Sequence, residues 1–326
     1  MHKLHSKDQS SPDEQSPRAA AGFDLLKRKR PKTAEEKAKK DKKKEAVQKY
    51  VEKVLAMGVP ALREEYQGLA EYTMGGRTQQ AFNANPCEYL HANYVGTLKK
   101  MFICTQSPHL RTIDEFWWLV WHQKAENIFM LSNVMEEGKC KSAQYWQVEV
   151  GEKRQVTNGA MVVEKIDMKP MAGEPTILIT DLKMTVGAET RYVRHFQWLD
   201  WPDEGVPPCR LTSMELFSSV RKSKGSIVVH CPDDTGRTET IVAIEYLLEV
   251  ISAGREYIAM GDLMKDLRQQ RAFSIQNDLQ YLYIHRVMLC YFLEKYKEKY
   301  SALLTEENTA KLEKFVEEYN DAVGQS

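Results

Sequence analysis

The residues with the clearest chemical potential are a cysteine and an arginine on one short loop. Cys231 follows the apolar, β-branched run 226–230, and Arg237 comes six positions later, ahead of the apolar run 241–248. These runs predict a buried strand and a buried helix. The N–H groups at a helix start stabilise anions, and an arginine fork holds two phosphate oxygens while lowering the pKa of a nearby thiol. The loop is therefore predicted to supply a thiolate nucleophile and a phosphate clamp; a buried structural cysteine is the alternative.

A second loop carries a candidate proton donor. Expulsion of a phenolate from phosphate requires an acid that reaches the leaving group from another segment of the chain. Asp203 lies in the sequence Trp-Pro-Asp-Glu-Gly-Val-Pro at residues 201–207, where proline and glycine favour a mobile loop and Trp201 can anchor one hinge. The pattern predicts a general acid; an ordinary turn between a strand and a helix is the alternative.

Short segments spread along the chain form a set with a fixed order. They are Tyr89-Leu-His-Ala-Asn-Tyr94, Phe102-Ile-Cys-Thr-Gln-Ser-Pro108, Phe116-Trp117, Gln144-Tyr145-Trp146, Trp201-Pro202-Asp203, Val229-His230-Cys231 and Gly236-Arg237-Thr238. Together they resemble the non-receptor type of protein tyrosine phosphatase, over about residues 46–296. The resemblance implies one α/β domain in which a twisted mixed sheet is flanked by helices.

The resemblance also implies a role for each matching residue. It makes Cys231 the nucleophile that forms a cysteinyl-phosphate, Arg237 the phosphate clamp, and Asp203 the acid that later activates water. The implied substrates are phosphotyrosine-containing proteins, and the implied mechanism uses no metal or cofactor. The residues implied to bind substrate are Pro232, Asp233, Asp234, Thr235, Gly236 and Gln276. The implied supporting residues are His230, Thr238, Trp201, Glu136, Lys141 and Gln280.

Several of these supporting roles can be stated. Thr238 matches a hydroxyl that helps the thiolate depart, and Glu136 matches a glutamate that fixes the arginine fork. Gln276 and Gln280 match glutamines of the loop that positions the hydrolytic water. Apart from the resemblance, Glu136 and Lys141 read as a solvated charged turn, and Gln276 as a polar residue that caps a helix.

The nucleophile loop departs from the pattern of the family it resembles. Where that pattern has Ser-Ala-Gly, this chain has Pro232, Asp233 and Asp234. Proline has no N–H, so one charge-assisted hydrogen bond, worth about 1.5–3 kcal/mol, is missing if that amide normally faces the phosphate. A carboxylate about 8 Å from a phosphate dianion repels it by roughly 4 kcal/mol at a dielectric of about 20, and far less where solvent screens the charge. These charges also raise the cysteine pKa, so we expect a slow enzyme.

Two further departures lie elsewhere. Glu239 stands where the pattern has glycine, and an acid in the first turn of a helix favours that helix. Between residues 63 and 89, nothing reproduces the Asn-Arg-Tyr motif whose tyrosine stacks on the substrate ring. Tyr72 and Phe82 are the aromatic candidates to replace it, and simple packing is their alternative role.

Composition divides the chain into three parts. Residues 1–45 are polar and basic and predict a disordered tail, residues 46–296 form the expected phosphatase domain, and residues 297–326 predict a charged amphipathic helix. Residues 1–50 hold 15 Lys/Arg against 8 Asp/Glu, whereas the remainder holds 31 against 38. Two parts of opposite net charge are expected to differ in their partners.

The basic cluster Lys27–Lys32 has several candidate partners. Concentrated positive charge suits an import receptor, nucleic acid or acidic lipid, and a solvated tail is the alternative. The six cysteines include no C-x-x-C pair, no apolar run approaches the ~20 residues of a transmembrane segment, and the start lacks the apolar core of a signal peptide. These features predict an intracellular protein, cytoplasmic or, through the cluster, nuclear.

Other elements follow from local patterns. Helices are predicted over residues 112–123, where Thr112 and Glu115 would form a capping box, and over 257–271, 278–296 and 305–319. Strands are predicted over 176–180 and 192–198.

Three functions are weighed against one another. The leading hypothesis is slow hydrolysis of phosphotyrosine, favoured by the retention of Cys231, Arg237, Asp203 and Gln276. A catalytically impaired pseudophosphatase, acting as a phosphotyrosine-binding or scaffold module, is favoured by residues 232–234. A third hypothesis gives the main role to the basic tail.

Overall fold

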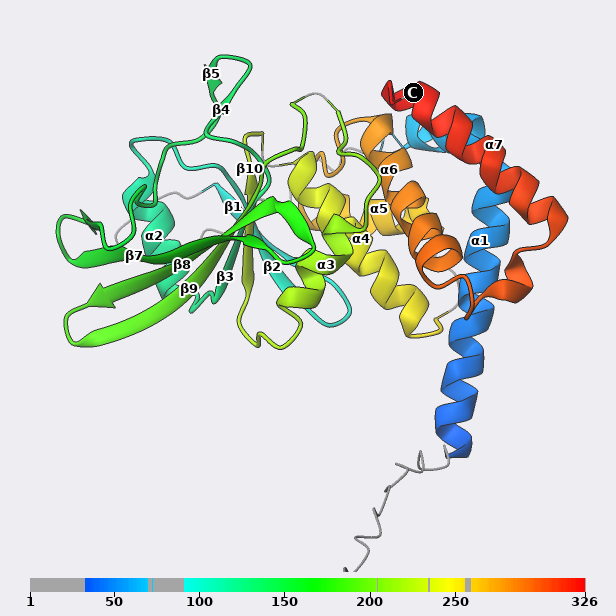
Figure 1. The fold of residues 1–326 in the computed structure, drawn as a ribbon, viewed down its shortest axis with the longest axis horizontal. Helices are drawn as coiled ribbons and strands as arrows, with labels where there is room; N and C mark the ends of the chain where they lie inside the picture. Colours follow the sequence, from blue (N-terminus) through cyan, green and yellow to red (C-terminus); the bar gives the residue numbers. More distant parts are fainter. Residues whose placement is uncertain are drawn as a thin grey trace, which may run out of the picture.

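A mixed β-sheet runs through the middle of the molecule (Figure 1). The computed structural model describes residues 33–69, 72, 91–203, 205–233, 235–255 and 259–325. Within them, eight strands pair in the order β1-β2-β10-β3-β9-β8-β7-β6. Neighbouring strands from β2 to β9 run parallel, and the flanking pairs run antiparallel. The strands are β1 (Ala92–Gly96), β2 (Met101–Gln106), β3 (Asn127–Met130), β6 (Lys153–Val156), β7 (Met161–Met171), β8 (Glu174–Val186), β9 (Glu189–Trp198) and β10 (Ile227–Cys231).

Helices lie on both sides of this sheet, and most of them gather on one side, at the right in Figure 1. They are α1 (Ala34–Gly68), α2 (Ile113–His122), α3 (Thr212–Ser219), α4 (Arg237–Ser252), α5 (Met260–Gln270), α6 (Asp278–Leu289) and α7 (Glu306–Val323). A π-helical segment, Cys290–Lys295, extends α6, and a short 3-10 turn covers Ser301–Leu303. The predicted α/β class with a mixed sheet flanked by helices is confirmed.

Strand β10 separates the two hydrophobic clusters of the core. Ile227, Val229 and Cys231 belong to the larger cluster with α1 and α3–α7, whereas Val228 belongs to the smaller cluster with α2. All five residues of β10 are buried, which explains why residues 227–229 are apolar and β-branched without alternation. The strand therefore delivers Cys231 to its carboxyl end, on the side of α4.

Helix α1 begins earlier than the sequence predicted. Thr33 forms a capping box with Glu36, and the Ala, Glu and Lys residues that follow are strong helix formers. Residues 34–45, which were assigned to the disordered tail, are therefore helical, although burial starts only at Ala46. The cluster Lys27–Lys32 lies outside the described residues.

Helix α7 belongs to the same core as the rest of the domain. Its Phe315 and Tyr319 are 1% and 0% exposed and pack in the larger cluster beside α1 and α6. Just after α7, the Gln325 Nε2 donates to the Val206 carbonyl at 3.3 Å. The segment that composition separated as residues 297–326 is thus joined to the domain by packing.

The predicted capping box at α2 is wrong. The Thr112 backbone has φ −119° and ψ 13°, and its side chain makes no capping hydrogen bond to the helix. Instead the Thr112 Oγ1 accepts from the His109 N–H at 2.9 Å, which closes the turn before the helix.

The helices were also compared with the length and hydropathy that a membrane span requires. Among the described residues, none meets both requirements.

Candidate active site

Cys231 lies where β10 ends and the loop to α4 begins. It is 1% exposed, and its carbonyl accepts from the Ser107 N–H at 3.0 Å, which fixes the strand end. Helix α4 starts at Arg237, so the sulfur-bearing residue and the free N–H groups of a helix start are brought to one loop, as the sequence predicted from strand and helix patterns. We name residues 230–238 the nucleophile loop.

Arg237 is held from one side by Glu136. Its Nη1 and Nη2 donate to the two Glu136 carboxylate oxygens at 2.8 and 2.9 Å, and Nη1 also donates to the Leu131 carbonyl at 2.9 Å. Glu136 is fixed in turn by the Asn133 N–H at 2.9 Å, in the hairpin of β4 (Met135–Glu136) and β5 (Lys139–Cys140). A bidentate pair with both partners buried sets the plane of the guanidinium.

Asp203 reaches the same guanidinium from the acid loop, residues 201–207. Its Oδ1 lies 3.2 Å from the Arg237 Nη2, and its Oδ2 lies 2.6 Å from the Lys141 Nζ. The hydrogen bond from Lys141 holds the pKa of Asp203 below its ordinary value, and the Arg237 charge acts in the same direction. The structure therefore brings Arg237, Asp203, Glu136 and Lys141 together from segments far apart in sequence, and Arg237 lies on the same loop as Cys231.

Trp201 anchors the start of the acid loop. Its ring is 2% exposed and packs against Trp198 and Tyr283, with ring centroids 4.9 and 5.9 Å apart. Its Nε1 donates to the Gly205 carbonyl at 3.2 Å, which folds the loop back on itself. A buried aromatic on one side of Asp203 provides a fixed point about which the loop can move.

His230 is part of a buried polar chain under the nucleophile loop. Its Nδ1 lies 2.9 Å from the Ser107 Oγ, and its Nε2 lies 2.7 Å from the Tyr145 hydroxyl, which also lies 2.7 Å from the His195 Nε2. Burial lowers the pKa of His230 well below its ordinary value and that of His195 to about 3. Both imidazoles are therefore neutral at physiological pH. No sequence motif connected His195 with this site.

The loop before α6 contacts Thr235, in the middle of the nucleophile loop. The Gln276 Nε2 donates to the Thr235 Oγ1 at 2.9 Å, and the Ile275 N–H donates to the Thr235 carbonyl at 3.0 Å. A Cβ atom at Gly236 would collide with the amide ends of Gln276 and Gln280, so a larger residue there would displace both glutamine side chains. Gln280 also accepts from the Gln276 N–H at 3.0 Å.

Thr238 carries a hydroxyl available for chemistry. The side chain is 0% exposed, and its Oγ1 has no hydrogen-bond partner among the described residues. Thr238 lies in the first turn of α4, directly after Arg237. A buried donor without an acceptor at this point can serve a sulfur anion on the same loop.

The substituted residues of the nucleophile loop differ in their positions. Asp233 is exposed, and its carbonyl accepts from the Thr235 N–H at 2.9 Å. The Asp233 charge is among those that raise the pKa of Lys141, after the hydrogen bond from Lys141 to Asp203. Pro232 is half-buried, and Asp234 lies outside the described residues. An exposed carboxylate is screened by solvent, so Asp233 repels a bound anion only weakly.

Glu239 was considered for its effect on the helix start, but the structure buries it completely. Its Oε1 lies 3.7 Å from the Arg271 Nε. The Arg271 Nη1 donates to the Asn93 Oδ1 at 2.6 Å and to the Cys104 carbonyl at 2.7 Å. Burial, together with the nearby Glu239, raises the pKa of Cys104 well above its ordinary value. This ion pair joins α4 to the segment that leads to Gln276. The one sequence feature that indicated it is Glu239 at a position where the family pattern has glycine.

Of the two aromatic candidates for stacking on a substrate ring, Tyr72 is among the described residues and lies on α5. The Tyr72 hydroxyl accepts from the Gln269 Nε2 at 2.9 Å, and the Lys265 Nζ lies 5.9 Å from the Tyr72 ring centre, so Tyr72 packs on α5. Phe82 lies outside the described residues.

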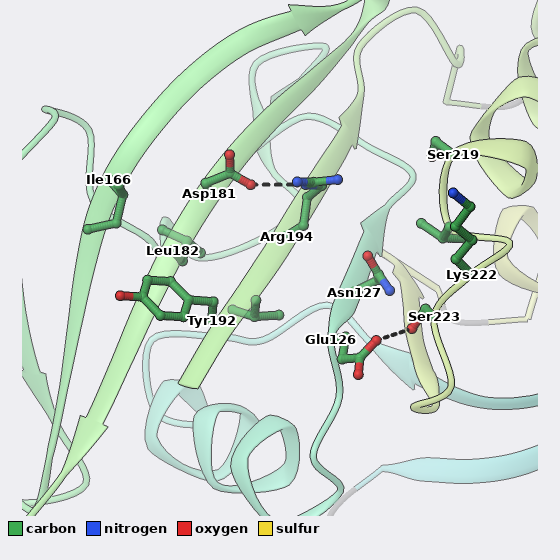
Figure 2. A pocket seen from close by; sticks show the side chains of 12 residues that line it. Glu126, Asn127, Ile166, Asp181, Leu182, Tyr192, Arg194, Ser219, Lys222 and Ser223 are labelled. Atoms are coloured by element: carbon green, nitrogen blue, oxygen red, sulfur yellow. Dashed lines mark hydrogen bonds and ion pairs between the residues drawn. The ribbon is translucent and has the colours of Figure 1, made fainter. Parts of the chain in front are cut away.

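A separate groove lies between the strands β8 and β9 and the end of α3 (Figure 2). Its volume is about 720 Å³, and two pairs of its polar side chains bind each other. Asp181 binds Arg194 at 3.0 Å, and Ser223 donates to Glu126 at 2.5 Å. None of its lining residues belongs to the nucleophile loop or the acid loop.

This combination of fold and loops can be compared with known proteins. The family model described as Protein-tyrosine phosphatase matches residues 76–290. The chain therefore belongs to the protein-tyrosine phosphatase family.

Individual relatives agree with this assignment. Tyrosine-protein phosphatase 69D of Drosophila melanogaster is 32% identical over 213 residues, which cover 62% of this chain and 14% of that protein. Receptor-type tyrosine-protein phosphatase alpha of Mus musculus is 28% identical over 216 residues, covering 63% of this chain and 25% of that protein. This chain thus spans a small part of the length of these relatives. The crystal structure of the catalytic domain of human protein tyrosine phosphatase non-receptor type 18 matches with a TM-score of 0.59 at 25% identity, covering 64% of this chain and 76% of that chain.

Proposed function

We propose that this chain hydrolyses phosphotyrosine in proteins, slowly, through a cysteinyl-phosphate intermediate. The observation that carries the proposal is the convergence on Arg237: Glu136 fixes its fork at 2.8 and 2.9 Å, and Asp203 approaches it at 3.2 Å. A fixed guanidinium on the same loop as a cysteine, at a helix start, is an arrangement suited to binding a phosphoryl group and stabilising its transferring charge.

Each step has a side chain suited to it. The Cys231 thiolate attacks phosphorus, Arg237 holds the non-bridging oxygens, and Asp203 gives its proton to the departing phenolate. In the second step Asp203 takes a proton from water that Gln276 positions. The Thr238 hydroxyl, which has no partner among the described residues, donates to the sulfur as it leaves. All groups in this scheme belong to the chain itself.

Two features account for the low expected rate. Lys141 holds the pKa of Asp203 down, so a smaller share of the molecules carries the acid proton at neutral pH. Pro232 cannot donate an N–H to phosphate, which removes about 1.5–3 kcal/mol of charge-assisted hydrogen bonding if that amide would face the anion.

The alternative proposal is a catalytically impaired module that binds phosphotyrosine or acts as a scaffold. Its supporting observation is the contact at 3.2 Å between Asp203 and Arg237, because an internal carboxylate there competes with a phosphate for the same donor. A molecule of this kind would use its loop for recognition rather than for turnover.

Turnover of an aryl phosphate by the purified chain separates the two proposals. The enzyme predicts a rate that disappears in the matched variant Cys231→Ser, which keeps the size of the side chain. Turnover that is absent from the parent chain, or that persists in Cys231→Ser, would reject the enzyme. Binding of a phosphotyrosine peptide by a parent chain without turnover would support the module.

The role of the basic cluster Lys27–Lys32 is a separate part of the proposal. We infer that it supplies a contact to an import receptor, nucleic acid or acidic lipid, and with it a nuclear or cytoplasmic location. Deletion of residues 1–32, which leaves α1 intact, should change localisation or retention on a polyanion column. Unchanged behaviour in both measurements would count against this role.

A further inference from the structure

A buried acid lies in the first turn of α4, two residues after Arg237. The Glu239 side chain is 0% exposed, and its Oε1 lies 3.7 Å from the Nε of Arg271, which is 3% exposed. A carboxylate removed from water is costly to a fold unless a nearby cation offsets its charge. Glu239 and Arg271 therefore depend on each other, and removal of one charge should disturb the other residue.

Arg271 is also fastened to the sheet. It directly follows α5, and its Nη1 donates to the Asn93 Oδ1 at 2.6 Å and to the Cys104 carbonyl at 2.7 Å. Asn93 and Cys104 are paired neighbours on β1 and β2. The side chain of Arg271 thus connects α4 with these two strands, and its backbone begins the segment 271–276 that leads to Gln276.

The segment 271–276 has a strained backbone. Phe273 and Ile275 both have φ 62°, in the left-handed region that β-branched and bulky residues seldom adopt. The Ser274 Oγ donates to the Arg271 carbonyl at 2.7 Å, and the Arg268 Nε donates to the Ser274 carbonyl at 3.2 Å. A strained backbone persists only where its surroundings fix it. The conformation of this segment therefore depends on the side chains that hold it.

The far end of the segment is docked on the nucleophile loop. The Tyr66 hydroxyl donates to the Ile275 carbonyl at 3.0 Å, and the Ile275 N–H donates to the Thr235 carbonyl at 3.0 Å. The Gln276 Nε2 then donates to the Thr235 Oγ1 at 2.9 Å. A shift of the segment at Arg271 would therefore be passed to Gln276.

We propose that Glu239 is a positioning residue, which through Arg271 holds the segment in the conformation that places Gln276 on the nucleophile loop. The family pattern has glycine at this position, and glycine offers Arg271 no carboxylate. The inference rests on the proposed function, in which Gln276 positions the water that completes the reaction.

The chemical consequence concerns the second step of that reaction. There water attacks the phosphorus of the cysteinyl-phosphate, the S–P bond breaks, Asp203 takes up a proton, and the Cys231 thiolate and inorganic phosphate are released. Loss of the placement of Gln276 should slow this hydrolysis and leave the formation of the intermediate nearly unchanged.

Hydrogen exchange in the full chain measures the positioning without reference to turnover. Glu239→Gln keeps the size of the side chain and removes its charge. Peptides that cover residues 272–280 should exchange at least about tenfold faster than in the parent chain, because loss of a buried ion pair loosens the segment. Glu245→Gln is the matched control, since Glu245 is another buried acid of α4 but binds Lys100, at 3.0 Å. Unchanged exchange in Glu239→Gln, or equal acceleration in both variants, would overturn the proposal.

The decay of the cysteinyl-phosphate measures the chemical consequence. After reaction with p-nitrophenyl phosphate and an acid quench, the phosphorylated Cys231 peptide is followed by mass spectrometry. In Glu239→Gln the decay should be about 10-fold to 100-fold slower. The value of kcat/KM, which reports formation of the intermediate, should stay within about twofold of the parent. An equal loss in both quantities would indicate damage to the whole site and would contradict a positioning role.

The variant Gln276→Ala shows whether the effect passes through Gln276. In the double variant with Glu239→Gln, the decay should be no slower than in Gln276→Ala alone, because an absent side chain cannot be misplaced. A further slowing by the full factor of the single variant would overturn the proposed connection.

Two outcomes are kept distinct by this design. If Glu239→Gln does not fold, Glu239→Asp, which keeps the charge but withdraws it from Arg271 by one methylene group, is measured by the same criteria. A parent chain without turnover would reject the proposed function, whereas the exchange of residues 272–280 would still decide whether Glu239 positions the segment.

Discussion

The Arg237 Nη2 and the Asp203 Oδ1 lie 3.2 Å apart, so the proposed phosphate clamp already holds a carboxylate of its own chain. The Lys141 Nζ, 2.6 Å from the other oxygen of Asp203, is engaged in the same way. A phosphoryl group that enters the site must therefore compete with Asp203 for at least one of the Arg237 donors. This competition can be measured.

Replacement of the competing carboxylate should strengthen anion binding. Asp203→Ala frees an Arg237 N–H and removes a negative charge, and a hydrogen bond to a charged group is worth about 1.5–3 kcal/mol. We expect tungstate to bind at least about tenfold more tightly, while turnover of a phosphate with a poor leaving group falls by about 10²–10⁴-fold. Calorimetric titration measures the first effect. Asp181→Ala, which breaks a distant ion pair with Arg194, is the control, and equal affinity in both variants would refute the competition.

Restoration of a donor to the nucleophile loop should raise activity. Pro232→Ser returns a backbone N–H, and we expect kcat/KM for an aryl phosphate to rise by roughly 10-fold to 100-fold. Asp233→Ala should raise it by less than about fivefold, because Asp233 is exposed and its charge is screened. Steady-state kinetics of the two single variants tests this order. A larger gain from Asp233→Ala would mean that this carboxylate turns toward the phosphate.

The pH dependence of activity should report the contact between Lys141 and Asp203. Asp203 must be protonated to act as an acid, and the hydrogen bond from Lys141 lowers its pKa. Lys141→Met removes this effect, the pKa of Asp203 rises, and the protonated form persists to higher pH. The descending limb of the plot of kcat/KM against pH should move toward higher pH. Lys169→Met, which removes an exposed partner of Asp167, should leave the limb in place. An unshifted limb in Lys141→Met would argue that another group is the acid.

Acid should unfold the protein partly through its buried histidines. Burial lowers the pKa of His195 and of His285 to about 3, whereas an unfolded histidine titrates near ~6.5. Stability is therefore present above the unfolded pKa and is lost as the pH falls toward 3, by about 1.4 kcal/mol per pH unit for each such histidine.

Urea unfolding between pH 7 and pH 5 measures this slope. In His285→Gln the slope should be smaller by about 1.4 kcal/mol per pH unit below the unfolded pKa, whatever the stability at pH 7. His122→Gln removes an exposed histidine at the end of α2 and should leave the slope unchanged. Equal slopes in the parent chain and in His285→Gln would contradict the assignment of a neutral buried imidazole.

The parts of the site that the sequence predicted are those in which chemistry fixes residue type and local spacing. Cys231 and Arg237 lie on one loop because a strand end and a helix start are a few residues apart, which hydrophobic patterns reveal. Asp203 could be predicted because the proline and glycine residues around it indicate a loop, and an aspartate on a loop can donate a proton to a leaving group. The fold class followed from the resemblance and from the buried run before Cys231.

The parts that the sequence did not predict depend on distances across the fold. Arg237 binds the backbone carbonyl of Leu131, and the identity of the side chain at 131 says nothing about such a contact. His195 joins His230 only through the Tyr145 hydroxyl, which lies far from both in sequence. Local patterns also misplaced the start of α1, because helix propensity can extend a helix well beyond the residues that bury it.

The early part of α1 gives the molecule a rigid spacer. Residues 34–41 are helical and exposed, and α1 extends there away from the rest of the fold (Figure 1). At 1.5 Å per residue these eight residues span about 12 Å. This stretch therefore holds Thr33, the attachment point of the preceding chain, at a set distance and orientation from the folded domain. Insertion of two residues into this stretch would rotate that attachment point by about 200° around the helix while lengthening it by only about 3 Å.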